Sequence, residues 1–271
     1  MAVIALASAS GAPGVTTTAI ALTLLSQRPT VLIEASPAGG SAVMAGYLRG
    51  EVATEGRSLL GLARAHRLGR LSDALGDETL PLDADGSRWL VPAIAETQQA
   101  PSLAPLWVPL AEALPQLDPL DVVVDAGRLG AAHGPEPLLA ACDLVLLCTR
   151  TQLPAVAAAR ARAEALRALT GPDGTPGPDV ELVVIGDGRP YTQDEISSVV
   201  GLPVLAAVAW DPVAADVLSN GSPRPRRWEQ GTFIRSLGSA SDAVAVRLRH
   251  RRERLVPAAL ADASAGGGSH D

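Results

Sequence analysis

The stretch that decides the fold runs from Ala2 to Thr17 and reads AVIALASASGAPGVTT. Its first part, Ala2–Ala7, is apolar and predicts a buried strand. A Gly-rich turn follows, and a helical pattern begins at Thr16. In α/β proteins, such a turn presents backbone N–H groups and a helix N-terminus to a bound phosphate. Many tight turns of this kind bind nothing, so the turn alone is a weak signal.

Outward from this stretch, short apolar runs alternate with helical patterns along most of the chain. The runs are apolar almost throughout, as expected for strands that are covered on both faces. Strands are predicted at Ala2–Ala7, Thr30–Glu34, Arg88–Pro92, Asp121–Asp125, Leu144–Thr149, Glu181–Ile185 and Val204–Ala209. Helices are predicted at Thr16–Ser26, Ser102–Leu114, Leu153–Leu169, Thr192–Val200 and Phe233–Leu255.

This alternation predicts one α/β domain with a mostly parallel central sheet of about seven strands and helices on both faces. The domain is expected to span residues 1–256. From residue 257 to 271 the composition is dominated by Ala, Gly, Ser and Asp, which predicts a disordered tail.

Composition narrows the possible classes of protein. The formal net charge is −7, which argues against a surface coated for generic nucleic-acid binding. Cys142 and Cys148 are the two cysteines, too few for a disulfide framework or a zinc site, and the four histidines share no ligand spacing. No apolar run reaches the roughly 20 residues that span a bilayer. We expect a cytoplasmic protein, either free or peripheral to the membrane or nucleoid. Every basic residue is an arginine, and the chain contains no lysine.

The turn at Ser10–Thr17 resembles the deviant Walker A loop of the ParA/MinD family, which reads Lys-Gly-Gly-x-Gly-Lys-Thr-Thr. Ser10 stands in place of the signature lysine and Val15 in place of the P-loop lysine. Further segments resemble the family in the same order along the chain: Val31–Pro37, Leu90–Ala93, Asp121–Asp125, Cys142–Thr149 and Gly201–Leu205.

The resemblance implies a SIMIBI-class P-loop fold and a nucleotide site. The residues that it assigns to this site are Gly11, Ala12, Gly14, Val15, Thr16, Thr17 and Asp125. Within this set, Thr16 would be the ligand of Mg²⁺ if a nucleotide binds, and no other metal site is expected. Weak binding of ATP or ADP with Mg²⁺ remains open, and so does the interpretation that the whole set is vestigial.

Three departures from the family pattern affect the chemistry. Each missing lysine removes charge-assisted hydrogen bonds worth about 1.5–3 kcal/mol. Ser36 stands where the family has its switch aspartate, and Gly186 stands where it has the Asn that contacts adenine. No catalytic residue is therefore assigned. The pattern favours a pseudo-ATPase with a degenerate Walker A motif, similar to CpaE and TadZ.

Two groups of arginines predict a surface that binds anions, either DNA phosphates or a membrane. The groups comprise Arg224, Arg226 and Arg227, next to Trp228, and Arg247, Arg249, Arg251 and Arg252, followed by Arg254. The alternative interpretation is a solvated helix face and a salt-bridged loop.

Three functional hypotheses follow. The first is a non-hydrolysing adapter that positions or assembles a pilus, secretion or cell-organisation machine, with protein partners that include a second copy of itself. The second is a partition protein that associates with DNA or the nucleoid and binds nucleotide weakly. The third, an ATP-dependent small-molecule enzyme of the same fold, requires a functional P-loop and ranks last.

Overall fold

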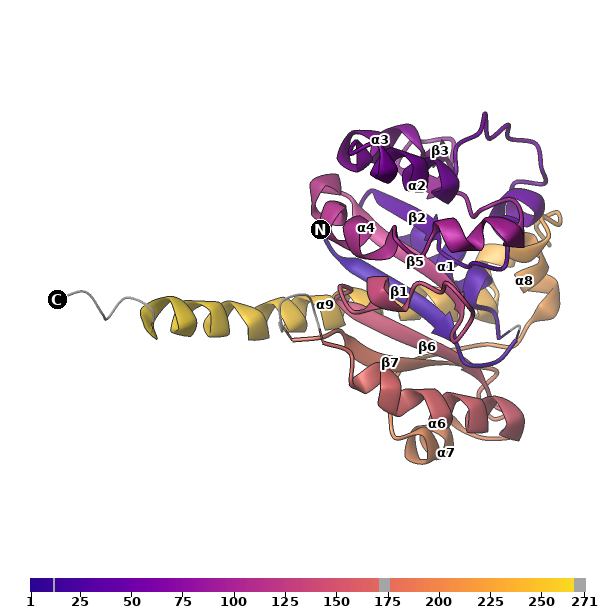
Figure 1. The fold of residues 1–271 in the computed structure, drawn as a ribbon. Coiled ribbons are helices and arrows are strands. Elements are labelled where there is room, and N and C mark those ends of the chain that lie inside the picture. Colours follow the sequence, from indigo (N-terminus) through magenta and orange to yellow (C-terminus); the bar gives the residue numbers. More distant parts are fainter. Residues whose placement is uncertain (12, 171–175, 266–271) are drawn as a thin grey trace.

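A computed structural model describes residues 1–11, 13–170 and 176–265 (Figure 1). In these residues, eight strands form one sheet in the order β3-β4-β2-β5-β1-β6-β7-β8. The strands are β1 Val3–Ser8, β2 Thr30–Glu34, β3 Leu80–Pro81, β4 Arg88–Val91, β5 Asp121–Arg128, β6 Leu144–Arg150, β7 Asp179–Ile185 and β8 Val204–Val208. All neighbouring pairs are parallel except β3 and β4. The predicted α/β class and the seven predicted strands are confirmed.

The described helices alternate with the strands. They are α1 Val15–Leu25, α2 Leu59–Arg67, α3 Leu71–Asp77, α4 Trp107–Ala113, α5 Glu136–Leu139, α6 Leu153–Arg167, α7 Gln193–Val200, α8 Pro212–Ser219 and α9 Thr232–Ala265. A π-helical turn, η1, spans Val43–Tyr47, and short 3-10 turns span η2 Thr97–Ser102, η3 Leu114–Leu117 and η5 Trp228–Gln230.

Three parts of this arrangement differ from the prediction. The eighth strand, β3, was not predicted because it has two residues and exists only through its antiparallel pairing with β4. Helices α2, α3 and α5 were also missed. The predicted helix over Ser102–Leu114 begins only at Trp107, after a turn that contains Pro105. Proline lacks the N–H that a helix interior requires, which explains the later start.

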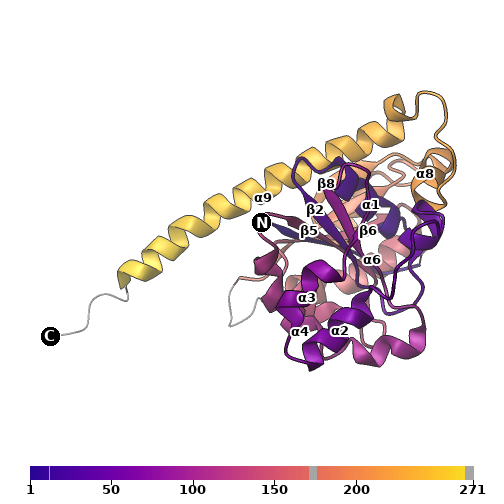
Figure 2. The ribbon, with the colours of Figure 1, turned by 90° about the horizontal axis from the view of Figure 1, so that it is seen from above.

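The sheet is buried on both faces. On one face, Val3, Ala5 and Ala7 of β1 point into a core that includes apolar residues of α2 to α7. On the other face, Ile4 and Leu6 point into a core shared with α1, α8 and α9. Figure 2 shows these two layers on opposite sides of the strands. Alternate residues of a strand face opposite sides, so an apolar run is what this arrangement requires.

Helix α9 packs along one face of the sheet and extends beyond the body of the domain (Figures 1 and 2). The predicted helix ended at Leu255, whereas α9 continues to Ala265 and so crosses the predicted boundary between residues 256 and 257. The Ala-rich sequence there has high helix propensity. Disorder remains a prediction for residues 266–271, which lie outside the described residues. None of the described helices is both long and apolar enough to cross a membrane.

We expect the docking of α9 to depend on Leu237, whose side chain has no exposed surface. Leu237→Ala would leave a cavity and lower the free energy of unfolding by about 2–5 kcal/mol. Val246→Ala is the matched control, because Val246 is 39% exposed on the same helix. The control should change stability by no more than about 0.5 kcal/mol. Urea unfolding measures both, and equal effects would contradict this role for Leu237.

Candidate functional site

The turn between β1 and α1, which the resemblance assigns to phosphate binding, is described by the structure except at residue 12. Gly14 precedes the helix with a φ of +96°, a conformation that residues with a side chain rarely adopt. A Cβ added to Gly11 or Gly14 would meet no atom within 4 Å, so the turn borders open space. A cavity of about 330 Å³ lies here, lined by Ser8, Gly11, Pro13, Gly14, Val15, Thr16, Thr17, Gly127 and Arg128. Ala12, also predicted here, lies outside the described residues.

Thr16 and Asp125, which the resemblance assigned to the same site, lie in contact. The Thr16 hydroxyl donates a hydrogen bond of 2.5 Å to the Asp125 carboxylate. The backbone N–H of Gly127 donates to the other carboxylate oxygen at 2.9 Å. Burial raises the pKa of Asp125, and these two hydrogen bonds oppose that shift. A hydroxyl and a carboxylate in this arrangement match the oxygen ligands and outer partners that Mg²⁺ prefers.

The phosphate side of the site lacks the lysine that the family pattern has at position 15. Val15 is only 6% exposed and packs in the apolar core between the sheet and α1. Pro13 has no backbone N–H to offer a phosphate. The arginine that lines this cavity is Arg128, at the exposed end of β5. Sequence reasoning missed Arg128 because it lies beyond the predicted strand Asp121–Asp125 and belongs to no motif.

An arginine and a tryptophan lie where the resemblance places the nucleobase. The guanidinium carbon of Arg150 is 3.7 Å from the centroid of the Trp210 ring, a cation–π contact. Both line a second cavity of about 300 Å³ that shares Pro13 and Gly14 with the phosphate turn. A Cβ added to Gly186 would lie 3.4 Å from the Cβ of Trp210. The position of the base-contacting Asn is thus a glycine packed against an aromatic side chain.

These observations test how well the site fits a magnesium nucleotide. Thr16 and Asp125 fit the metal ion. On the phosphate side Val15 contributes no charge, and Arg128 lines the cavity there. On the base side, Arg150 stacks over Trp210 at the wall of the second cavity. Among the residues that the structure describes, no cluster of three or more His, Cys, Asp or Glu side chains is arranged to hold a metal ion.

Glu34 forms a buried anchor beside this site. It pairs with Asp125 in the register of β2 and β5. Its carboxylate accepts hydrogen bonds from the Ser41 hydroxyl, from the N–H of Val43 at 3.0 Å and from the N–H of Ala93 at 3.4 Å. Burial raises its pKa to about 7, and the charge of Asp125 adds to the shift. The sequence indicated only that Glu34 departs from the family's aspartate.

Ser36, at the switch position, makes a local contact in place of the missing carboxylate. Its hydroxyl accepts a hydrogen bond of 3.4 Å from the N–H of Ala38. A Cβ on Gly127 would lie 2.8 Å from the Ser36 oxygen, so the two segments can approach only because residue 127 is glycine. The switch segment therefore packs closely against the end of β5.

Some arginines of the C-terminal group form ion pairs in the structure, and the others are exposed. Arg247 pairs with Glu181 and, at 3.5 Å, with Asp179. Arg251 is buried and lies 3.5 Å from Asp179. Arg254 lies 2.6 Å from the same carboxylate. For Arg247 and Arg251, the predicted anion-binding surface is therefore corrected to an ion-pair network with β7.

The remaining arginines of the prediction are exposed. Arg249 and Arg252 lie on the outer part of α9, and Arg226 and Arg227 lie before η5. Arg224 is 3.5 Å from Glu229 and lies over the Trp228 ring at 5.0 Å. An exposed pair of this kind contributes little to stability.

The α/β sheet, with a Gly-rich turn after its central strand and a threonine–aspartate pair beside that turn, defines a P-loop type of fold. Solved structures with this fold are ParA and MinD ATPases. The ParA family ATPase from Chlorobium tepidum matches with a TM-score of 0.69 at 16% identity, over 89% of this chain and 97% of that one. The MinC:MinD cell division complex from Aquifex aeolicus matches with 0.68 at 15%, over 90% and 96%.

The septum site-determining protein MinD from Pyrococcus horikoshii, complexed with Mg-ADP, matches with a TM-score of 0.66 at 14% identity, over 90% of this chain and 95% of that one. No protein-family model and no curated protein matches the chain. The chain therefore has the ParA/MinD fold over nearly its whole length, and these identities establish the fold alone.

We expect Glu34 to make stability depend on pH. Its folded pKa of about 7 lies above the ordinary 4.5, so its contribution is complete below the ordinary value and is lost as the pH rises toward 7. The loss is roughly 3 kcal/mol at most. Glu34→Gln cannot titrate and should lack this slope. Urea unfolding at about pH 5 and about pH 8 measures the difference. Equal slopes in the two proteins would contradict the assignment, since Asp125 is present in both.

Proposed function

We propose that this chain is a non-hydrolysing pseudo-ATPase of the ParA/MinD type that acts as a positioning or assembly adapter. The observation that carries the proposal is that Val15, which stands in place of the P-loop lysine, puts an apolar side chain into the core beside the phosphate turn. Loss of two charged hydrogen bonds would weaken nucleotide binding by about two to four orders of magnitude.

The base side supports the same proposal. A nucleobase would have to displace Arg150 from the face of Trp210, and it would find glycine at position 186 instead of a hydrogen-bonding amide. Breaking a cation–π contact costs about 0.5–2 kcal/mol. Nucleotide binding is therefore disfavoured separately at the phosphate end and at the base end.

A partner-binding role is supported by a groove on the surface of the described residues. It has a volume of about 830 Å³ and lies between α1, η1, the loop after β3 and η5. Leu25, Leu48 and Trp228 contribute apolar surface, and Asp83 and Asp85 lie at its edge. An amphipathic segment of a partner protein, with basic residues beside its apolar face, fits this chemistry. The MinC:MinD complex is an example of the same fold bound to a protein partner.

The proposal places the adapter in the cytoplasm, with one or more protein partners, a second copy of the chain among them. The runner-up, a partition protein on DNA, has less support because Arg247, Arg251 and Arg254 are paired with carboxylates of β7 and adjacent residues. The net charge of −7 also repels nucleic acid.

Calorimetric titration with ATP and ADP in the presence of Mg²⁺ tests the proposal. We expect dissociation constants in the roughly millimolar range or weaker and no phosphate release. Val15→Lys alone should not restore hydrolysis, because Ser10, Ser36 and Gly186 still lack the family's side chains. The control is Val246→Lys, which adds the same charge on an exposed part of α9. Steady turnover of ATP by the wild-type protein would refute the proposal.

A further inference from the structure

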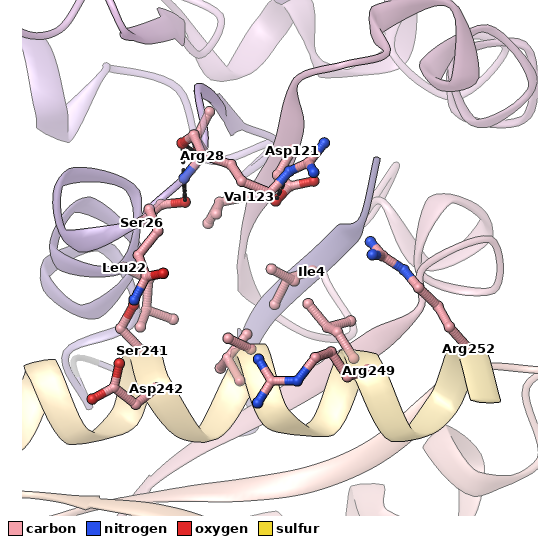
Figure 3. Close-up of a pocket in the computed structure, with 15 residues that line it drawn as sticks. Ile4, Leu22, Ser26, Arg28, Asp121, Val123, Ser241, Asp242, Arg249 and Arg252 are labelled. Atoms are coloured by element: carbon pink, nitrogen blue, oxygen red, sulfur yellow. Dashed lines mark hydrogen bonds and ion pairs between the residues drawn. The ribbon is translucent and has the colours of Figure 1, made fainter. Parts of the chain in front are cut away.

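Another cavity, separate from those described above, lies at the edge of the sheet opposite the phosphate turn. It has a volume of about 270 Å³ and lies between the end of α1, the starts of β1, β2 and β5, and α9. Figure 3 shows Ile4, Leu22 and Val123 around its interior, above α9. Its apolar residues are Ile4, Leu22, Val123, Val244, Ala245 and Leu248. These side chains form an apolar floor, and the uncharged polar residues Ser26, Gln27, Thr30 and Ser241 also line the cavity.

The polar edge of this cavity carries positive charge that is only partly compensated. Arg28 is neutralised by Asp121, 3.1 Å away, and also donates to the Pro119 carbonyl at 2.8 Å. Arg249 forms no hydrogen bond or ion pair with any residue that the structure describes. Arg252 donates to the Met1 carbonyl at 3.0 Å, and no described carboxylate pairs with it.

The remaining charged group at the edge is Asp242, which is exposed on α9. In Figure 3, Asp242, Arg249 and Arg252 follow one another along the part of α9 that borders the cavity. Arg249 and Arg252 are three residues apart and therefore lie on one side of the helix. The edge thus presents two guanidinium groups next to an apolar floor.

We infer that this cavity binds an amphipathic anion: one short alkyl chain with a carboxylate or phosphate head. The apolar floor removes the chain from water, and the planar guanidinium groups hold the head through paired N–H donors. Ligand pockets typically enclose about 300–1,000 Å³, so this smaller cavity accommodates one chain and not two. The site is independent of the proposed function, because none of its residues touches the phosphate turn.

DNA phosphates fit this site less well than an amphipathic anion does. A nucleic-acid backbone would use Arg249 and Arg252 but would leave the apolar floor without a partner. A compound with an alkyl chain uses both features at once. The apolar floor, together with Arg249 and Arg252 at its edge, therefore favours an amphipathic anion over a nucleic acid.

Calorimetry on the full-length protein tests the inference with octanoate, octyl phosphate and the uncharged octanol as probes. Both anions should bind at least about tenfold more tightly than octanol, because the alcohol forms no charged hydrogen bond. The tighter of the two anions identifies the head group. Equal affinities for all three probes would overturn the inference, since the arginines would then contribute nothing.

Variants separate the contributions of the edge and the floor. Arg249→Gln together with Arg252→Gln should weaken binding of the anions by about tenfold or more and leave octanol unchanged. Arg226→Gln together with Arg227→Gln removes the same charge from a distant exposed loop and should leave all three affinities unchanged. Ala245→Leu fills the floor from a partly exposed position and should abolish binding of every probe.

Thermal unfolding verifies that each variant folds before it is titrated. Unchanged octanoate binding by folded Ala245→Leu would overturn the inference, because the cavity would then not be the site. The last experiment measures binding of the same proteins to anionic phosphatidylglycerol vesicles. If Arg249 and Arg252 promote vesicle binding, and folded Ala245→Leu binds the vesicles as the wild type does, the arginines serve a membrane surface and the inference fails.

Discussion

The carboxylate of Asp125 connects the segments that meet at the C-terminal edge of the sheet. It accepts hydrogen bonds from Thr16 at the start of α1 and from the backbone of Gly127, and it lies beside Glu34 in the neighbouring strand. Because Asp125 is buried, an unpaired carboxylate there would carry a large desolvation cost. This requirement fixes where α1 begins, and so it fixes the phosphate turn that precedes the helix.

The same constraint explains the electrostatics around the turn. Glu34 and Asp125 are neighbouring buried acids, and their mutual repulsion adds to desolvation in raising the pKa of Glu34. The Glu34 carboxyl accepts hydrogen bonds from Ser41 and Val43 and so holds this segment in place. Glu34 and Asp125 therefore both contribute hydrogen bonds that hold neighbouring segments in place.

The strands and the phosphate turn could be predicted because each rests on local sequence. A buried parallel strand must be an apolar run, so the strands could be recognised from the sequence, whereas Thr16 and Asp125 were assigned to one site through the resemblance to the ParA/MinD family. The cation–π pair of Arg150 and Trp210 could not be predicted, because it joins the ends of two strands through side chains that belong to no motif. Strand β3 also depends on a pairing that its own two residues do not signal.

The arginine cluster shows why charge counted along a helix is not charge available on a surface. Arg247, Arg251 and Arg254 are spaced by four and three residues, so they form one stripe along α9, and that stripe faces Asp179 on β7. Arg249 and Arg252 form a second stripe, rotated away from those carboxylates. The first stripe is used to dock the helix, and burial of its charges is offset by the ion pairs. Only the second stripe leaves positive charge for a ligand, and it does so at the edge of the sheet farthest from the phosphate turn.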